Sequence, residues 1–408
     1  MATDSLKKNI IETIFVRGGF LILNFVIVWL VTLYWHAEGN GIRALFVVDL
    51  SIISIFCNVF TSSSVSYYLK RVGMHKLATQ AYIWVFVVSG ILSIFLSLRS
   101  EGSHLSLFLF IVSILMGFVA FHSALYIGCQ KIPYYNLIMF LQPLLLLFFM
   151  VILHYAFQNK LSYYAYFYAQ IISLFFISAI AQIITRNTLG KSKFQLDRNT
   201  MIHSFHFGWK TELSSLLQLL NGRVSMYILS YVSGLKSVGI FAIGVAFSEA
   251  IWIFSKSISL VQYSNVLQKG DTDEIRMETK KVSFVSLFVS AICIAIIVGL
   301  PADFFVWIFK NEEFRYVKTV ILLMSPGILA IAISNVYGHF FSAIGKLKIL
   351  IVKSAIGLLV TVVLALLLIA KFEIAGACMV NSCAYLVSSL ILIMAFFKNK
   401  KNSIFAAS

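Results

Sequence analysis

Residues 282–302 read VSFVSLFVSAICIAIIVGLPA, a run of 21 residues without a charge. About 20 apolar residues in a helix are enough to cross the hydrocarbon core of a bilayer, so this stretch predicts a membrane-spanning helix. The whole chain has the same character: of 408 residues, 60% are hydrophobic and 12% charged, and the mean hydropathy is +0.93. Soluble domains contain about 25% charged residues. An integral membrane protein is therefore expected, which excludes the usual classes of soluble enzyme.

Eleven further apolar runs of similar length lie along the chain. Together they predict twelve membrane-spanning helices and an all-α polytopic membrane protein. The predicted spans are 11–35, 42–68, 78–98, 104–128, 134–157, 161–185, 205–232, 238–262, 282–302, 317–344, 349–370 and 374–397. The connections between them are short, which leaves no room for a folded domain outside the membrane.

The distribution of basic residues predicts the orientation of these spans. If the even-numbered connections and both termini lie on one side, that side receives twenty of the 32 Lys and Arg residues, and the other side receives eight. Basic residues are enriched in cytoplasmic connections, so both termini are expected in the cytoplasm. The same asymmetry accounts for the net charge of +16 without a nucleic-acid partner.

The longest polar connection, residues 186–201, separates six spans from six. It predicts an N-terminal lobe over residues 1–198 and a C-terminal lobe over 199–408. Two lobes related as repeats are typical of transporters whose substrate site lies near the middle of the membrane.

Two short echoes between the halves support such a repeat. Residues 41–47 (GIRALFV) are similar to residues 239–245 (GIFAIGV) at an offset of 198 positions. Ile127 and Gly128 recur as Ile344 and Gly345 at an offset of 217 positions.

Short motifs follow one another along both halves of the chain. They are AEGNGI at 37–42, FGWK at 207–210, LLNGR at 219–223, VGIFAI at 238–243, SEAIW at 248–252, IFKNEEF at 308–314, SPG at 325–327, AIGKLK at 343–348 and EIAGA at 373–377. In this order and spacing they resemble the O-antigen, or Wzx-type, flippases of the multidrug/oligosaccharidyl-lipid/polysaccharide (MOP) exporter superfamily. The sequence departs from the pattern at Ser225, where relatives often have an acid.

The resemblance implies a flippase rather than an enzyme. It would move polyprenyl (undecaprenyl)-pyrophosphate-linked oligosaccharide repeat units, of O-antigen or a related polysaccharide, from the inner to the outer leaflet of the bacterial inner membrane by alternating access. Its partners would be this substrate, membrane lipid and the polysaccharide polymerase machinery. The sequence has no nucleotide-binding glycine-rich loop, so an H+ or Na+ gradient, or consumption of the product outside, would supply the energy. No cofactor is implied.

Four of the 32 Lys and Arg residues are assigned to neither side and lie within the predicted spans, where each costs about 2.5–3.5 kcal/mol on insertion scales if it faces lipid. They are Arg17, Lys210, Arg223 and Lys256. Arginine offers a planar fork of donors and lysine a point charge, and both suit a pyrophosphate. These residues predict a cationic, substrate-binding vestibule. The alternative for each is a structural ion pair or a side chain that reaches the membrane interface.

Acidic and amide side chains in the spans are the other candidates. Glu249 and Asp49 are the candidate ion-coupling residues, and Glu249 shares a helix face with Lys256, so an ion pair between those two is the structural alternative. The candidate residues lining a polar cavity are Asn24, Asn58, Glu212 and Asn221. The intramembrane histidines His122 and His154 are isolated and the five cysteines contain no C-x-x-C pair, so neither a metal site nor a disulfide framework is expected.

Two rival functions remain open. An ion-coupled multidrug or cation antiporter of the same superfamily would be expected to carry acidic residues that bind its cationic substrates. Within the predicted spans of this chain the cations do not outnumber the acids, and only their depth and position favour a cationic site. A membrane glycan polymerase or ligase would need an external catalytic loop, but the longest outer connections, near residues 303–316, have only about fourteen residues. A facilitator-type carrier is disfavoured, because residues 69–76 (LKRVGMHK) lack the Gly-Asp-Arg-Gly-Arg character of that class.

The orientation can be tested by cysteine labelling in intact cells. Lys193→Cys and Lys400→Cys should be shielded from an impermeant thiol reagent, because both positions are predicted to be cytoplasmic, and Asn311→Cys should be labelled. Labelling of Lys193→Cys without permeabilisation would reverse the orientation.

Overall fold

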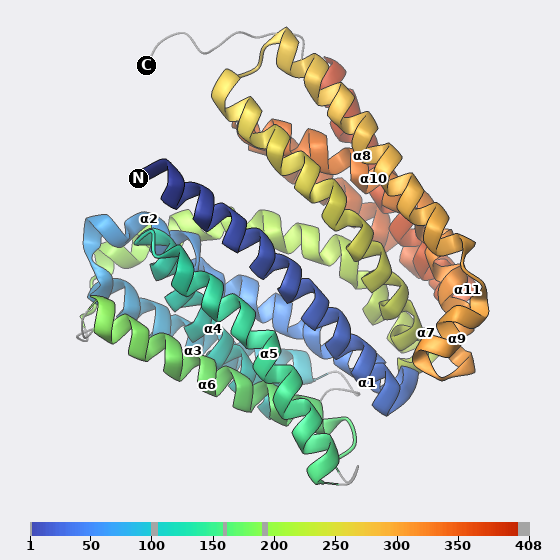
Figure 1. Cartoon of the computed structure of the whole chain (residues 1–408), viewed down its shortest axis with the longest axis horizontal. Coiled ribbons are helices and arrows are strands. Elements are labelled where there is room, and N and C mark those ends of the chain that lie inside the picture. Colours follow the sequence, from blue (N-terminus) through green and yellow to red (C-terminus); the bar gives the residue numbers. More distant parts are fainter. Residues whose placement is uncertain (1, 99–104, 158–160, 190–194, 399–408) are drawn as a thin grey trace. The chain divides into compact units, whose positions relative to one another are not determined.

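The structure is a computed structural model that describes residues 2–98, 105–157, 161–189 and 195–398 (Figure 1). Lys193 and Lys400 lie outside these residues, as does the side chain of Lys210. All regular structure in the described part is helical, which confirms the predicted fold class at the level of an all-helical, multi-span membrane protein. The elements are α1 (Ala2–Thr61), α2 (Ser63–Val72), α3 (Met74–Ser97), α4 (Ser106–Gly128), α5 (Ile132–Ala156), α6 (Tyr164–Leu189), α7 (Arg198–Lys269), α8 (Asp273–Gly299), α9 (Ala302–Phe309), the 3-10 helix η2 (Glu312–Tyr316), α10 (Val317–Ala343) and α11 (Leu347–Lys398).

Nine helices in the described residues are long and apolar enough to cross a membrane. Three of them, Phe15–Leu69, Ser215–Leu267 and Leu347–Lys398, contain 55, 53 and 52 residues. A straight helix of that length would measure about 80 Å, far more than the ~30 Å hydrocarbon core. The predicted number of twelve spans therefore depends on how these three helices cross the bilayer.

Each of the three long helices contains one residue with a left-handed backbone. These residues are His36 with φ 55°, Gly234 with φ 75° and Glu373 with φ 48°. A right-handed helix does not continue through such a residue, so each long helix consists of two helical segments joined at a kink.

By the contacts within the chain, the protein divides into two compact units. Unit 1 contains Met1–Trp35 and Phe46–Leu216, and unit 2 contains His36–Leu45 and Leu217–Ser408. These units differ from the predicted lobes in two places. The first part of α7 packs within unit 1, and a short segment of α1 packs within unit 2.

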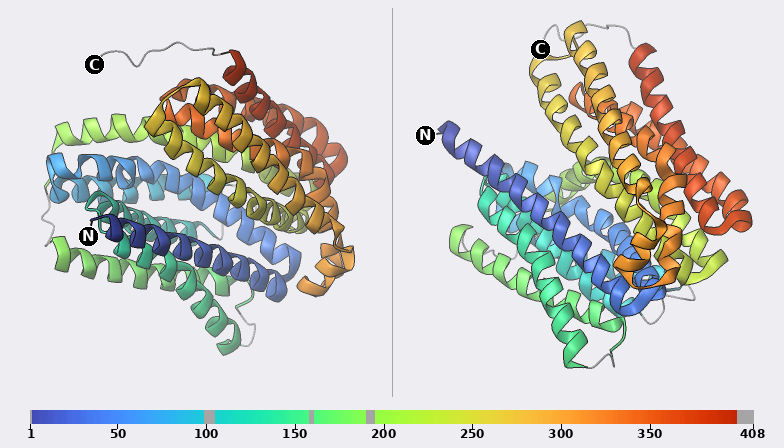
Figure 2. Two further views of the ribbon diagram at one scale, coloured as in Figure 1. Left: turned by 45° about the horizontal axis from the view of Figure 1, so that its top comes forward. Right: turned by 45° about the vertical axis from the view of Figure 1, so that its right-hand side comes forward.

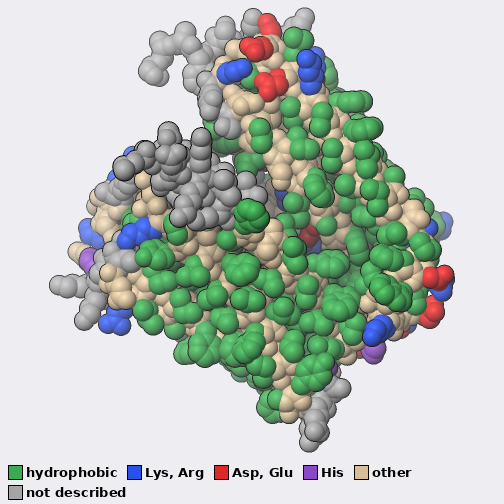
Figure 3. Space-filling model, in the orientation of Figure 1, with side chains coloured by type: hydrophobic (Ala, Val, Ile, Leu, Met, Phe, Trp, Pro, Cys, Tyr) green, Lys and Arg blue, Asp and Glu red, His purple; other side chains and the backbone are tan. Residues whose placement is uncertain are grey.

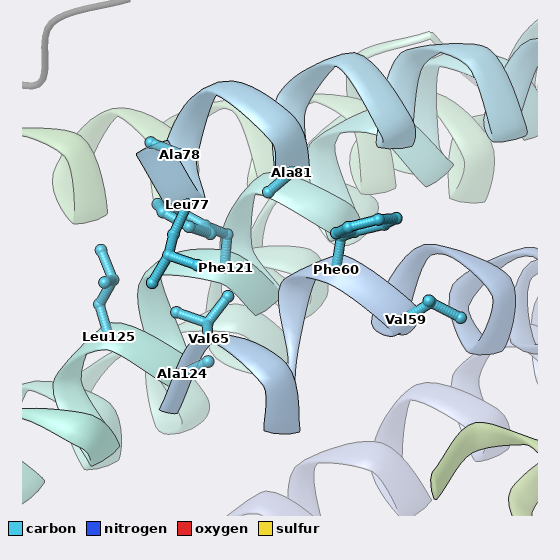
Figure 4. Close-up of a cluster of buried hydrophobic side chains, with 9 residues drawn as sticks. All are labelled: Val59, Phe60, Val65, Leu77, Ala78, Ala81, Phe121, Ala124 and Leu125. Atoms are coloured by element: carbon cyan, nitrogen blue, oxygen red, sulfur yellow. The ribbon is translucent and has the colours of Figure 1, made fainter. Parts of the chain in front are cut away.

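In unit 1, α3 to α6 lie side by side (Figure 2). A core cluster joins α1, α2, α3 and α4, and it consists of Val59, Phe60, Val65, Leu77, Ala78, Ala81, Phe121, Ala124 and Leu125 (Figure 4). Lipid is as apolar as these side chains, so helix association in a membrane depends on close packing rather than on the hydrophobic effect. The three alanines allow the helices to approach closely.

In unit 2, α10 packs against both α8 and α11. A second cluster joins these helices to the end of α7, and it consists of Val266, Ile275, Tyr337, Phe340, Phe341, Leu392 and Phe396. On the visible faces of both units the surface is mostly hydrophobic, and charged side chains gather near helix ends (Figure 3). Phe95, Phe284 and Leu366 are each 65% exposed or more, as lipid-facing side chains would be.

Contacts between connections agree with the predicted alternation of sides within each unit. In unit 1, Lys76 in the second connection pairs with Asp197 in the sixth at 2.7 Å. The hydrogen bonds from Lys76 and Thr200 lower the pKa of the Asp197 carboxyl to about 2. In unit 2, Lys236 in the seventh connection pairs with Glu313 in the ninth, also at 2.7 Å. Even-numbered connections thus meet each other, and so do odd-numbered ones.

Within unit 2, the part of α7 that follows the kink at Gly234 crosses the short segment of α1 that belongs to this unit. The backbones of the two segments are in contact at the crossing. A Cβ on Gly41 would overlap the carbonyl oxygen of Leu235, and a Cβ on Gly239 would overlap the carbonyl oxygen of Ala37. The buried Asn40 side chain also donates a hydrogen bond of 2.9 Å to the Gly239 carbonyl. Only glycine at the two crossing positions permits this approach.

This crossing is reciprocal and explains the first echo between the halves. Residue 37 corresponds to 235 and residue 41 to 239, which is the offset of 198 positions seen in the sequence. The left-handed residues His36 and Gly234 are also 198 positions apart. The two halves therefore meet here with local two-fold symmetry.

The second echo is not in structural register. Gly128 is the last residue of α4, whereas Gly345 follows the end of α10 and has a left-handed backbone, with φ 74°. The corresponding left-handed residue after α4 is Gln130, with φ 58°. The matching dipeptides therefore mark helix ends, but they occupy different positions in them.

The crossing predicts a large effect for a single added methyl group. Gly239→Ala should destabilise the protein by about 1–3 kcal/mol or more, because the backbones must separate to accept the Cβ. Gly18→Ala is the matched control, since a Cβ there has nothing within 4 Å. Thermal unfolding of the purified variants in detergent measures both, and equal midpoints for the two variants would contradict the close crossing.

Candidate functional site

The structure places Arg17 on α1 in unit 1 with an exposed side chain. Asn24, seven residues later, is half-buried and donates to the carbonyl oxygen of Phe20 at 2.7 Å. Asn58 accepts a hydrogen bond of 3.2 Å from Thr61. Both amides thus have polar partners on their own helix.

Two predicted acids of unit 1 are buried. Asp49 is 4% exposed, and it has an interaction partner. Glu212 is 8% exposed and lies on the first part of α7, before the residue at which that helix passes into unit 2. The vestibule predicted from Arg17, Lys210, Arg223 and Lys256 draws on residues of both units, of which Arg223 and Lys256 belong to unit 2.

In unit 2, the guanidinium of Arg223 forms an ion pair with the carboxylate of Glu249 at 2.5 Å. Arg223 precedes the kink at Gly234 and Glu249 follows it, so the two segments of α7 bring the charges together. Their side chains are 25% and 45% exposed. Glu249 thus pairs across the kink with Arg223, whereas Lys256 on its own helix face is exposed and forms no ion pair among the described residues.

Polar and aromatic side chains surround this ion pair. Tyr385 interacts electrostatically with both Arg223 and Glu249, and its ring lies 5.5 Å from that of Trp252. Ser225, at the position that departs from the family pattern, donates to the side-chain oxygen of Asn381 at 2.8 Å.

The predicted lining residue Asn221 is also fixed in unit 2. It is 7% exposed, and its side-chain oxygen accepts a hydrogen bond of 2.7 Å from Thr361 on α11.

Two buried donors near the ion pair have no acceptor among the described residues. They are the indole N–H of Trp252 and the side-chain amide of Asn381. A buried donor without an acceptor is costly, and natural proteins rarely leave one unless a ligand or water satisfies it. The surroundings of Arg223 are thus rich in unused donors.

A second group of charged and aromatic side chains begins on the face of α7 that carries Glu249. Glu249, Trp252, Lys256 and Tyr263 follow one another at helical spacing. The ring of Tyr263 lies 5.7 Å from that of His339 on α10. Lys256 and Lys353 both interact electrostatically with His339.

Because Glu249 and Lys256 share one face of α7, two turns apart, we group the Arg223–Glu249 pair with Lys256, His339 and Lys353 and call these five residues the unit 2 charge cluster. Sequence reasoning missed two of its members. His339 is a lone histidine in an apolar run, and Lys353, near the start of the predicted span 349–370, is one of the twenty basic residues assigned to the cytoplasmic side. Neither position carries a signal that a single sequence could reveal, because the cluster joins three helices that are far apart in the chain.

Comparison with known proteins identifies the fold. No protein-family model and no curated protein sequence matches the chain. Among solved structures, the inward closed conformation of the lipid II flippase MurJ is similar with a TM-score of 0.75 and 15% identity, over 95% of this chain and 87% of that one. An inward-facing MATE multidrug resistance transporter of the MOP superfamily is similar with a TM-score of 0.70 and 13% identity, over 94% of this chain and 99% of that one. A MOP superfamily transporter from Pyrococcus furiosus is similar with a TM-score of 0.62 and 11% identity, over 96% of this chain and 93% of that one. That transporter is described with a binding pocket of reverse polarity.

The chain therefore has the fold of MOP superfamily transporters and flippases. The similar solved structures named above are those of transporters and a flippase, not of enzymes. At these identities the likeness establishes the fold, and the substrate must be argued from the side chains.

The Arg223–Glu249 ion pair can be tested by a double-mutant cycle on thermal stability. Arg223→Gln and Glu249→Gln should each destabilise the protein, and the double variant should lose less than the sum, with a coupling free energy of about 1 kcal/mol for this partly exposed pair. The same cycle on Lys236 and Glu313, a pair of which one member is 60% exposed, should give a smaller coupling. Additive effects at Arg223 and Glu249 would show that the two side chains do not interact.

Proposed function

We propose that this protein flips polyprenyl-pyrophosphate-linked oligosaccharide repeat units, of O-antigen or a related polysaccharide, from the inner to the outer leaflet of the bacterial inner membrane. The observation that carries the proposal is the excess of positive charge in the unit 2 charge cluster. It holds Arg223, Lys256 and Lys353 against the single carboxylate of Glu249. Cations inside a membrane protein are costly, so an uncompensated group of them is retained where an anion binds.

The neighbouring side chains suit the same substrate. Pyrophosphate oxygens accept strong hydrogen bonds from arginine and lysine. The buried donors of Trp252 and Asn381, which have no acceptor among the described residues, would meet further acceptors of the substrate. The similarity to a lipid II flippase in fold supports a substrate that carries a lipid.

The proposal includes a topology of twelve spans with both termini in the cytoplasm. Nine helices of the described part are long and apolar enough to cross a membrane, and the kinks at His36, Gly234 and Glu373 would divide the three long ones into two spans each. Contacts between alternate connections agree with this count. The two six-span lobes would then work by alternating access, and H+ or Na+ would be the coupling ion.

A multidrug or cation antiporter is the second candidate, because MATE transporters share the fold. A cationic substrate needs a free carboxylate. In unit 2 the carboxylate of Glu249 is held by Arg223 and stands among cations, which favours an anionic substrate instead.

The function can be tested in cells that depend on this protein for a surface polysaccharide. Lys256→Glu and Lys353→Glu should trap lipid-linked repeat units in the inner leaflet and lower flux, roughly 10–100-fold for the loss of one charge-assisted hydrogen bond. Lys256→Arg and Lys353→Arg should retain most activity, and Lys236→Gln is the control, since Lys236 lies outside the cluster.

Immunoblots of membranes must show equal amounts of each variant. Arg223→Lys should keep part of the activity and Arg223→Ala should lose it. Wild-type surface polysaccharide in both Lys256→Glu and Lys353→Glu would contradict the proposal, and extrusion of a cationic dye by the wild-type protein would favour the antiporter.

A further inference from the structure

A cavity of about 270 Å³ lies within unit 1, between α1, α4 and α5. Its wall contains six apolar residues, among them Phe20, Met116 and Met139, and three polar ones. Beside the cavity the helices touch, since a Cβ on Gly19 of α1 would overlap the ring of Phe140 on α5. Most of the lining residues are half-buried rather than buried, so the cavity is open at the surface. Ligand pockets begin at about 300 Å³, so this one has room for one end of a lipid rather than for a whole lipid.

The three polar residues in the wall are Ser123 on α4 and Tyr135 and Gln142 on α5. None of their side chains forms a hydrogen bond with a residue that the structure describes. The carbonyl oxygen of Met139 also lacks its usual helical donor, because Pro143, four residues later, has no N–H. Inside a membrane such groups are costly unless another group bonds to them. The cavity therefore offers both hydrogen-bond donors and acceptors to a ligand.

The composition of the wall limits the chemistry of that ligand. None of the described residues that line the cavity is charged, which disfavours an anion or a cation. Water would bond to the polar groups, but it would fill a space with mainly apolar walls, and apolar cavities stay dry. A hydrocarbon chain alone would leave the donors and the acceptors unpaired. A long-chain alcohol meets both requirements, because its hydroxyl both donates and accepts while its chain contacts the apolar wall.

We propose that this cavity binds the hydroxyl end of an uncharged lipid alcohol. The hydroxyl would lie among Ser123, Tyr135 and Gln142, and the chain would pass the two methionines, whose flexible side chains adapt to it. Ser123 is five residues before the end of α4, and Tyr135 is three residues after the start of α5, which places them about 5–8 Å inside these helix ends. A neutral hydroxyl can reach that depth in a bilayer, whereas a charged group there is costly. A diacylglycerol and a polyprenol share this chemistry, and competition between them identifies the source.

A ligand in this cavity would hold α1 against α4 and α5. Helix α1 continues from unit 1 into unit 2 after Trp35, so the ligand would stabilise a helix to which both units contribute. A molecule that binds only the folded protein raises the midpoint of thermal unfolding. The site does not depend on the proposed function, because none of its lining residues belongs to the unit 2 charge cluster.

The site can be tested with a diacylglycerol that carries a photoactivatable diazirine in its acyl chain, close to the glycerol. In nanodiscs the full-length protein should form crosslinks within residues 116–123 or 135–142, mapped by mass spectrometry, and unlabelled dioleoylglycerol should displace the probe. Dioleoyl phosphatidate has the same chains and a charged head, so it should compete more than about 10-fold less well. A polyprenol as the third competitor shows which alcohol binds more tightly. Equal competition by dioleoylglycerol and dioleoyl phosphatidate would overturn the proposal.

Substitutions in the wall test the same site. Ala120→Trp should fill the cavity and abolish the displaceable crosslinks. Leu137→Trp is the matched control and should keep them, because Leu137 is 43% exposed on α5 and lies outside the lining. Tyr135→Phe and Gln142→Leu largely preserve the shape of the wall, and each should weaken competition by dioleoylglycerol roughly 5-fold through the loss of one hydrogen bond.

Thermal unfolding provides a readout that needs no crosslinking. Dioleoylglycerol should raise the unfolding midpoint of the wild type and leave that of Ala120→Trp unchanged. Absence of displaceable crosslinks in the wild type, or their survival in a folded Ala120→Trp variant, would overturn the proposal. If Ala120→Trp does not fold, the double variant Tyr135→Phe with Gln142→Leu decides, since unchanged competition there would also overturn it.

Discussion

The backbone crossing of α1 and α7 in unit 2 is the constraint on which the architecture depends. Two glycines, Gly41 and Gly239, allow each helix to touch a carbonyl of the other, and the arrangement is reciprocal at an offset of 198 residues. The left-handed residues His36 and Gly234 lie directly before the two crossing segments. The path of the chain at the start of both halves is therefore set by the same local geometry, used twice. Neither glycine can change to a larger residue without disturbing the partner backbone.

Charge inside the protein follows a second constraint, the cost of an unpaired ion away from water. In unit 2, Arg223 and Glu249 neutralise each other, and Lys256 and Lys353 remain beside His339. The proposed function assigns an anionic substrate to this excess of positive charge.

The sequence predicts features that depend on local composition and misses those that depend on distant contacts. Apolar runs such as residues 282–302 identify α8 directly, and the repeated Gly-Ile dipeptide marks the helix crossing. The kink at Glu373 could be anticipated only from span length, since glutamate carries no left-handed preference. The Arg223–Glu249 pair joins residues 26 positions apart across a kink, so helical periodicity pointed to Lys256 instead. His339 and Lys353 join the cluster through tertiary packing alone.

The central claim is that the unit 2 charge cluster recognises a pyrophosphate carried by a lipid. The most direct measurement is the affinity of purified protein in nanodiscs for a polyprenyl pyrophosphate, compared with the uncharged polyprenol of the same length. The account predicts that the pyrophosphate binds more tightly than the polyprenol, and that Lys256→Gln combined with Lys353→Gln removes this difference without unfolding the protein. Equal affinities for the two lipids in the wild-type protein would contradict it.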